Sequence, residues 1–218
     1  AALVHFTTEM ERRESSRWGE MRRFEIVPYC LDLPTQAQPQ SVQNRTGLLF
    51  LARIDPKKGL DLLFEALAQL QREQIRPRLT IAGSGAEDYV AWLKALAAQL
   101  GIAEQIVWAG FADEARKQQL FAEAEVFILP SYSENFGIAP VEALAAGLPV
   151  IITEPAAVSE AMGAATAALV TPCDAAAIAN AIRQLIANPP LQQRLQQNGL
   201  QLTRDYFSST ATVARWVN

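Results

Sequence analysis

The feature that most constrains the fold is a regular alternation of short apolar runs with segments of helical periodicity across residues 47–170. Short runs with little charge are typical of strands that are buried on both faces of a sheet. They predict six strands of one sheet. The runs are "GLLFLA" (47–52), "RLTIAG" (78–83), "QIVWAG" (105–110), "EVFILP" (125–130), "LPVIIT" (148–153) and "AALV" (167–170).

The segments between these runs carry apolar side chains three and four residues apart, as Leu60, Leu63, Phe64 and Leu67 illustrate. Such a stripe predicts a helix with one face on the core. Strands and helices in this order predict an α/β domain whose parallel strands are joined by right-handed crossovers. Ligands of such domains bind beyond the carboxyl ends of the strands, so the loops that follow the runs are where a site is expected.

The rest of the chain departs from this alternation. In residues 1–25, "ALVHFT" predicts a strand and "TEMERRESSRW" a polar helix, and residues 26–45 are rich in Gln and Pro, which is typical of a linker. The α/β pattern occupies residues 46–185, and residues 186–218 predict helices interrupted by a Pro-Pro pair. The chain has neither an initial Met nor a signal-peptide pattern, and we interpret it as part of a longer protein.

Composition narrows the classes of function. Half of the residues are hydrophobic and 19% are charged, which allows a sizeable core. The net charge of −4 and the absence of Lys/Arg runs longer than two argue against a nucleic-acid partner. Cys30 and Cys173 are far apart and outside any CxxC pair, which favours free thiols in a reducing compartment and hence a cytoplasmic location.

The loops after the first three runs contain candidate ligand contacts. "ARIDPKKG" brings Arg53 and Lys58 together, and such cations suit a diphosphate, although a solvated turn is the alternative. Asp61 is a candidate N-cap of the helix that follows. Gly83 permits a tight turn with close backbone approach, and Gly110 with Phe111 could border a flat ring. Plain turn glycines are the alternative at both places.

The loop after the fourth run is the most informative. Pro140 is suited to the first turn of a helix, which places the amides of Gly137, Ile138 and Ala139 at the positive end of that helix, where anions bind. Two acids flank this point. We predict that Glu142, in the first helical turn, accepts hydrogen bonds from vicinal hydroxyls, while Glu134 reaches the other side of the anion. A nucleotide sugar has hydroxyls on both sides of its phosphates; a helix-terminal acid and a solvated loop acid are the alternative.

These residues together resemble a known family. "ENFGIAPVEALAAGLPVI" is similar to the Glu-x7-Glu signature of retaining glycosyltransferases of the GT-B fold, in particular glycosyltransferase family four (group 1). "ARIDPKKG", "LTIAGSG", "IVWAGF" and "AEVFILPS" match further motifs of that family in order. The resemblance covers about residues 1–185 and implies a Rossmann-like doubly wound parallel sheet with helices on both faces, the C-terminal half of a GT-B fold. Residues 1–25 would then be a remnant of the N-terminal acceptor domain.

The resemblance also implies roles for single residues. Arg53 and Lys58 would hold the donor diphosphate, and Gly110 and Phe111 would border the nucleobase. Glu134 would bind the donor sugar with the amides of Phe136 and Gly137. The amides of Ile138 and Ala139 would contact phosphate, Glu142 would contact ribose, and Gly83 would border the donor.

The implied chemistry needs no metal or other cofactor, because cationic side chains stabilise the leaving diphosphate. The implied function is transfer of a hexose from a UDP- or GDP-sugar to a glycan or lipid-linked acceptor. That acceptor, and any peripheral membrane contact, would meet the missing N-terminal domain, so the chain alone would be poorly active. A nucleotide-sugar hydrolase or epimerase of the GT-B fold and a degenerate nucleotide-binding module remain as alternatives. The sequence departs from the family at "VPYCLDL", where Tyr29-Cys30 replaces the usual Asn-Gly of a hinge, and at several Ala residues after "VIIT" that replace Gly.

Overall fold

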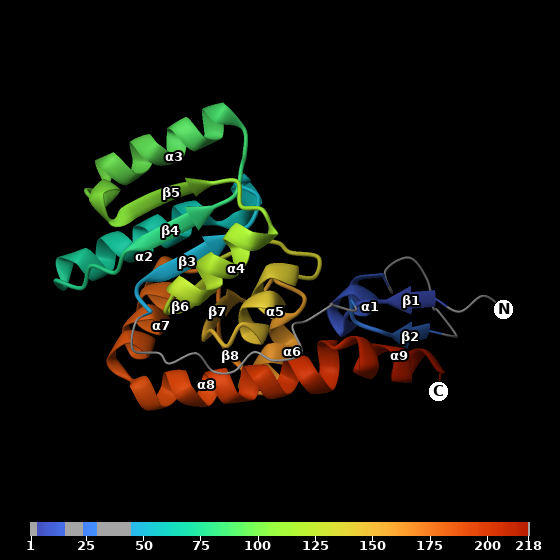
Figure 1. The fold of residues 1–218 in the computed structure, drawn as a ribbon. Helices are drawn as coiled ribbons and strands as arrows, with labels where there is room; N and C mark the ends of the chain where they lie inside the picture. The colour runs from blue at the N-terminus through green and yellow to red at the C-terminus, as the bar shows by residue number, and fades with distance from the viewer. Residues whose placement is uncertain (1–3, 16–23, 30–44, 218) are drawn as a thin grey trace.

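The computed structural model describes residues 4–15, 24–29 and 45–217. Its centre is a six-stranded parallel sheet with the strand order β5-β4-β3-β6-β7-β8 (Figure 1). Each predicted run forms one of its strands, so the expected α/β fold with a Rossmann-like doubly wound sheet is confirmed. The strands are β3 (Leu48–Leu51), β4 (Leu79–Ala82), β5 (Ile106–Gly110), β6 (Val126–Leu129), β7 (Val150–Thr153) and β8 (Ala168–Thr171).

The strand order creates a switch point at the middle of the sheet. The chain proceeds from β3 outward to β4 and β5, and then returns to place β6 on the other side of β3. Leu48 pairs with Val126 and Leu49 with Phe127 across this junction. Because successive connections leave in opposite directions here, the loops after β3 and β6 diverge and leave room for a ligand between them.

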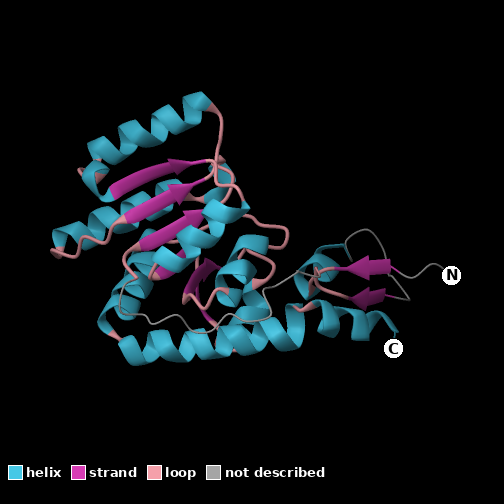
Figure 2. Ribbon diagram, viewed as in Figure 1, coloured by secondary structure: helices cyan, strands magenta, loops and turns pink. Residues whose placement is uncertain are grey.

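Helices cover both faces of the sheet (Figure 2). In the view of Figure 1, α4 and α5 lie in front of the strands, and α2 and α7 lie behind. Phe50 and Phe127, on the two central strands, are fully buried between these layers. The helices of this part are α2 (Leu60–Arg72), α3 (Glu87–Gln99), α4 (Glu114–Glu123), α5 (Ile138–Ala145), α6 (Ser159–Ala164) and α7 (Ala175–Ala187), with short 3₁₀ turns η3 (Pro56–Lys58) and η4 (Ala103–Gln105).

The two ends of the chain add a smaller layer. Strands β1 (Val4–Phe6) and β2 (Phe24–Ile26) pair in parallel, and α1 (Glu9–Ser15) follows β1. Helix α7 ends before Asn188, as the Pro-Pro pair predicts. The chain continues as α8 (Pro189–Leu202), the π-helical turn η5 (Thr203–Phe207) and α9 (Ser209–Val217). Most of the predicted linker lies outside the described residues, and the proposed domain boundaries stay predictions.

Gly83 is required by the close approach of neighbouring strand ends. A β-carbon on Gly83, whose φ is 140°, would lie 1.9 Å from the carbonyl oxygen of Ala52. The Gly83 amide also donates to the carbonyl of Gly110 at 2.7 Å. Gly83 therefore sets the spacing of the ends of β3, β4 and β5, and its contact with a donor stays a prediction.

We expect Gly83→Ala to destabilise the domain by about 3 kcal/mol or more, because the methyl group adds a steric overlap with backbone to an unfavourable φ. Urea unfolding followed by circular dichroism measures this. Gly110→Ala is the matched control. Its φ is also positive, at 71°, but a β-carbon there meets nothing within 4 Å, so a loss of about 1 kcal/mol is expected. Equal losses at the two positions would contradict the steric role of Gly83.

Candidate functional site

An ion pair joins the two loops at the switch point. The ammonium of Lys58, in the turn after β3, contacts Oε2 of Glu134, in the loop after β6. Both side chains are largely buried, with 9% and 18% of their surfaces exposed. The sequence predicted both residues for one site, and the structure brings them into direct contact.

The backbone beside Lys58 explains how the pair is positioned. Asp55 caps the η3 turn by accepting a hydrogen bond from the Lys57 amide at 3.1 Å. Gly59 ends the turn in a left-handed conformation, and a β-carbon there would lie 2.0 Å from the carbonyl oxygen of Pro130. The "KKG" turn therefore packs directly on the end of β6, and only glycine permits that approach.

Tyr132 ties the same two loops together and was not foreseen from the sequence. Its amide donates to the carbonyl of Lys57, and its hydroxyl donates to Oδ2 of Asp61, both at 2.8 Å. Burial, and then the hydrogen bond to Asp61, raise the pKa of Tyr132. The prediction that Asp61 caps α2 is wrong: the N-cap is Gly59, and Asp61 lies inside the first turn, where it accepts from Tyr132.

The loop that carries Glu134 is fixed along its backbone. The Glu134 amide donates to Pro155 at 3.3 Å, and its carbonyl accepts from Ala157 at 3.1 Å. The carbonyl of Phe136 accepts from the amide of Val158 at 3.2 Å. The Phe136 side chain is only 3% exposed, so this residue can meet a ligand through its backbone, as the resemblance implies.

Helix α5 begins where the sequence predicts. Gly137, with a φ of 97°, is the N-cap and supplies no side-chain hydrogen bond to the first turn. A β-carbon on Gly137 would lie 3.5 Å from Cγ of Glu134, so the helix start and the acid are neighbours. The first turn contains Ile138, Ala139 and Pro140, without an acidic side chain. The amides at this end can meet an anion, and that contact stays a prediction.

The position of Glu142 requires a correction. It is the fifth residue of α5 and lies one turn beyond Ile138, not in the first turn. Its Oε1 accepts a hydrogen bond from the ammonium of Lys117 on α4 at 2.6 Å, and its side chain is 23% exposed. Glu142 remains near the start of the helix, but its carboxylate is already engaged by a lysine that sequence reasoning missed.

The electrostatics of Lys117 follow from its two acidic partners. It also contacts Glu114 at 2.7 Å. Burial acts to lower the pKa of Lys117, but the hydrogen bonds to Glu114 and Glu142 outweigh burial and raise this pKa above its usual value. Lys117 therefore remains charged at neutral pH.

The remaining predicted residues lie at more open places. Gly110 ends β5 with positive φ and open space beside it, and Phe111 is 77% exposed. Arg53 is exposed after β3 and has no ion-pair partner among residues 4–15, 24–29 and 45–217. The structure thus joins Lys58, Glu134 and the start of α5 directly, while within the described part of the chain no ion pair or ring contact links Arg53 or Phe111 to them. The ligand roles of all these residues stay predictions.

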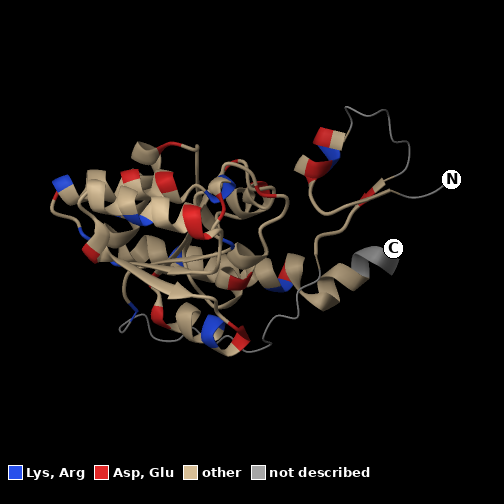
Figure 3. Ribbon diagram, turned by 90° about the horizontal axis from the view of Figure 1, so that it is seen from above, with Lys and Arg blue, Asp and Glu red and all other residues tan. Residues whose placement is uncertain are grey.

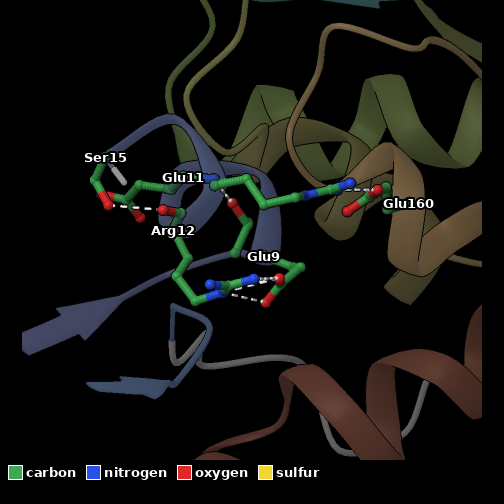
Figure 4. A network of polar contacts seen from close by, with 7 residues as sticks. Glu9, Glu11, Arg12, Ser15 and Glu160 are labelled. Atoms are coloured by element: carbon green, nitrogen blue, oxygen red, sulfur yellow. Dashed lines mark hydrogen bonds and ion pairs between the residues drawn. The ribbon is translucent and has the colours of Figure 1, made fainter. Parts of the chain in front are cut away.

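Helix α1 and Tyr29, at the start of the predicted linker, lie beside the Glu134 loop. A cavity of about 300 Å³ separates α1 from this loop, and Tyr29 lines it. The ring of Tyr29 meets the ring of Phe136 edge-on at 5.0 Å. Arg13 of α1 pairs with Glu160 of α6, and Figure 4 shows this contact beside the Arg12–Glu9 pair. The lining residues are Thr7, Met10, Glu11, Glu14, Tyr29, Ser133, Glu134, Asn135, Phe136, Pro155 and Ala157.

Charge is mixed over the molecule rather than gathered in one large patch (Figure 3). Within the described residues, no group of three or more His, Cys, Asp or Glu side chains is arranged to hold a metal ion. None of the helices in the described part of the chain has both the length and the apolar character to span a membrane. Cys173 is a free thiol and Cys30 lies outside the described residues.

The fold is the Rossmann-like α/β fold of GT-B glycosyltransferases. Residues 34–202 match the family model of glycosyl transferases group 1, which is more than half of the chain. The chain therefore belongs to the glycosyl transferases group 1 family, as the sequence resemblance predicts.

Relatives and solved structures agree with this assignment. The chain is 32% identical over 216 residues to the D-inositol 3-phosphate glycosyltransferase of Nocardia farcinica, covering 91% of the chain and 47% of that protein. It is 31% identical over 175 residues to the glycogen synthase of Mycobacterium tuberculosis, covering 78% and 42%. The chain thus spans less than half the length of these curated relatives.

Two solved structures show the same fold. The sucrose-phosphate synthase of Thermosynechococcus elongatus superimposes with a TM-score of 0.84 at 23% identity, over 100% of this chain and 57% of that one. HepE of Anabaena, solved with UDP and glucose, gives a TM-score of 0.83 at 21% identity, over 100% and 62%.

We predict that Lys58 and Glu134 are coupled in stability by about 1 to 3 kcal/mol, because both charges are mostly removed from water. A double-mutant cycle with Lys58→Met and Glu134→Gln, followed by urea unfolding, measures the coupling. Arg183 and Glu73 form the control pair, at 2.7 Å with 36% and 45% of their side chains exposed. Their coupling is expected to stay below about 1 kcal/mol. A Lys58–Glu134 coupling no larger than this control would contradict the structural role of the pair.

Proposed function

We propose that this chain is the donor-binding part of a retaining glycosyltransferase that transfers a hexose from a nucleoside diphosphate sugar. The observation that carries the proposal is the Lys58–Glu134 contact at the switch point, next to the glycine-capped start of α5. One cation, one carboxylate and a set of helix-terminal amides meet there. That combination suits a diphosphate with a hydroxyl-bearing sugar on one side.

The diphosphate is assigned to the start of α5 and to the two cations after β3. Lys58 has three N–H donors, so it can keep Glu134 and still donate to a phosphate oxygen. Arg53 has no competing carboxylate among the described residues and supplies the second cation. As the bond to the sugar breaks, negative charge grows on the diphosphate, and fixed cations and amides stabilise that charge without reorganising.

The two acids are assigned to hydroxyl groups on either side of the diphosphate. Glu134 uses the carboxylate oxygen that Lys58 leaves open to accept from the donor sugar, and Glu142 accepts from the ribose. Gly110 and Phe111 border the base at the open end of β5. A UDP-sugar is the favoured donor, because the Anabaena structure with the same fold holds UDP and glucose; a GDP-sugar is the second candidate. The acceptor is a glycan or lipid-linked group held by the N-terminal domain of the whole enzyme.

We expect Lys58→Ala to weaken binding of UDP or GDP about tenfold and to leave binding of the free nucleoside nearly unchanged. The physical reason is that the lost charge acts on phosphate oxygens only, and a tenfold change is about 1.4 kcal/mol. Isothermal titration calorimetry with UDP, GDP, uridine and guanosine on the 218-residue chain measures the four affinities.

Lys57→Ala is the matched control, because Lys57 neighbours Lys58 in the same turn but is exposed and has no ion-pair partner among the described residues. Its effect should stay below about threefold, as for other exposed charges. Equal losses for the nucleoside and the diphosphate in Lys58→Ala would contradict the assignment. Absence of heat with both UDP and GDP at millimolar concentration would instead indicate a degenerate module.

A further inference from the structure

Lys117 connects two elements that the proposed donor site needs. It lies in the first turn of α4, where its amide donates to the carbonyl of Asp113 at 2.8 Å. Helix α4 starts at Glu114, three residues after Phe111 on the base side. The ammonium reaches across to Glu142 on α5, one turn from Ile138 on the phosphate side. The side chain of Lys117 thus spans the interval between the places proposed for the base and for the phosphates.

The contact with Lys117 engages only one of the two carboxylate oxygens of Glu142. Lys117 holds Oε1 at 2.6 Å, and Oε2 accepts no hydrogen bond from the described residues. A carboxylate held by one oxygen keeps its other oxygen in a defined direction. The second partner of Lys117, Glu114, is 71% exposed and therefore contributes little to fixing the ammonium.

The charge of Lys117 also matters for the ligand. A free Glu142 carboxylate near the start of α5 would repel the phosphates and lose part of the benefit of the helix terminus. With Lys117 beside it, the local charge of the pair is neutral, while the capacity of Glu142 to accept hydrogen bonds persists. Glu142 can thus accept hydrogen bonds from ribose hydroxyls without repelling the diphosphate.

We propose that Lys117 is a positioning residue that orients Glu142 toward the vicinal hydroxyls of a bound ribose and so sets the preference for ribonucleoside over deoxyribonucleoside diphosphates. This inference rests on the proposed function. Lys117 acts through Glu142 rather than on the reacting atoms, so its removal affects recognition of the sugar ring of the nucleotide before it affects any transfer step.

The test compares the affinities of UDP and 2′-deoxy-UDP, or GDP and 2′-deoxy-GDP if guanine is preferred, by titration calorimetry. Wild-type protein should favour the ribonucleotide about tenfold or more, a difference of about 1.4 kcal/mol that one good hydrogen bond to a charged group supplies. Lys117→Met, similar in length but uncharged, should reduce this ratio to near one. Lys117→Arg should restore most of it, because a cation is again within reach of Glu142.

Glu114→Gln is the matched control, because it removes the exposed partner of Lys117 and leaves the Glu142 contact in place; its ratio should equal that of wild type. Thermal unfolding of each variant separates folding from recognition, and Lys117→Gln replaces Lys117→Met if that variant does not fold. An unchanged ratio in the folded Lys117 variant overturns the role of Lys117 alone. A wild-type ratio near one overturns it together with the assignment of Glu142 to the ribose, while the proposed diphosphate site stands. Failure of wild-type protein to bind either ribonucleotide overturns the proposed function together with it.

Discussion

The contact between Lys58 and Glu134 is the interaction on which the candidate site depends. It joins loops that leave neighbouring strands in opposite directions, and it does so where little water reaches either side chain. Removing two charges from water costs several kcal/mol, which their attraction offsets only in good geometry. Gly59 and Tyr132 supply that geometry by holding the η3 turn against the end of β6. An ion pair of this kind adds little net stability, but it holds its two charges at a defined place.

The two acids of the site share one arrangement. Glu134 is held by Lys58 from the β3 loop, and Glu142 is held by Lys117 from α4. In both, the lysine engages one carboxylate oxygen and comes from another part of the chain. Neutralising each acid in this way removes its repulsion toward an anion. In the proposed function, the attraction for an anion then comes from the amides that follow Gly137, from the N–H donors that Lys58 keeps free, and from Arg53, which has no ion-pair partner among the described residues.

Sequence reasoning located the six strands and the loops that contain the candidate site residues, because apolar runs and glycine positions are local signals. It also brought Lys58 and Glu134 to one site, since both follow strands of a parallel sheet. It placed Glu142 one turn too early and Asp61 at a cap, because helix starts depend on hydrogen bonds that a pattern does not encode. The contact of Lys117 with Glu142 was not predicted from the sequence. The periodicity of α4 indicates which side of the helix is buried, but not which acid of another helix lies opposite that side.

The Glu134 loop is fixed from both ends of the chain. The ring of Phe136 makes edge-on contacts with Tyr29, at 5.0 Å, and with Phe207, at 6.0 Å. Tyr29 lies at the start of the predicted linker and Phe207 in the turn after α8. Aromatic contacts of this kind add roughly 1 kcal/mol each beyond the area they bury. The Phe136 carbonyl is held at the same time by Val158. The Glu134 loop is therefore also held by packing from residues outside the motif that contains Glu134.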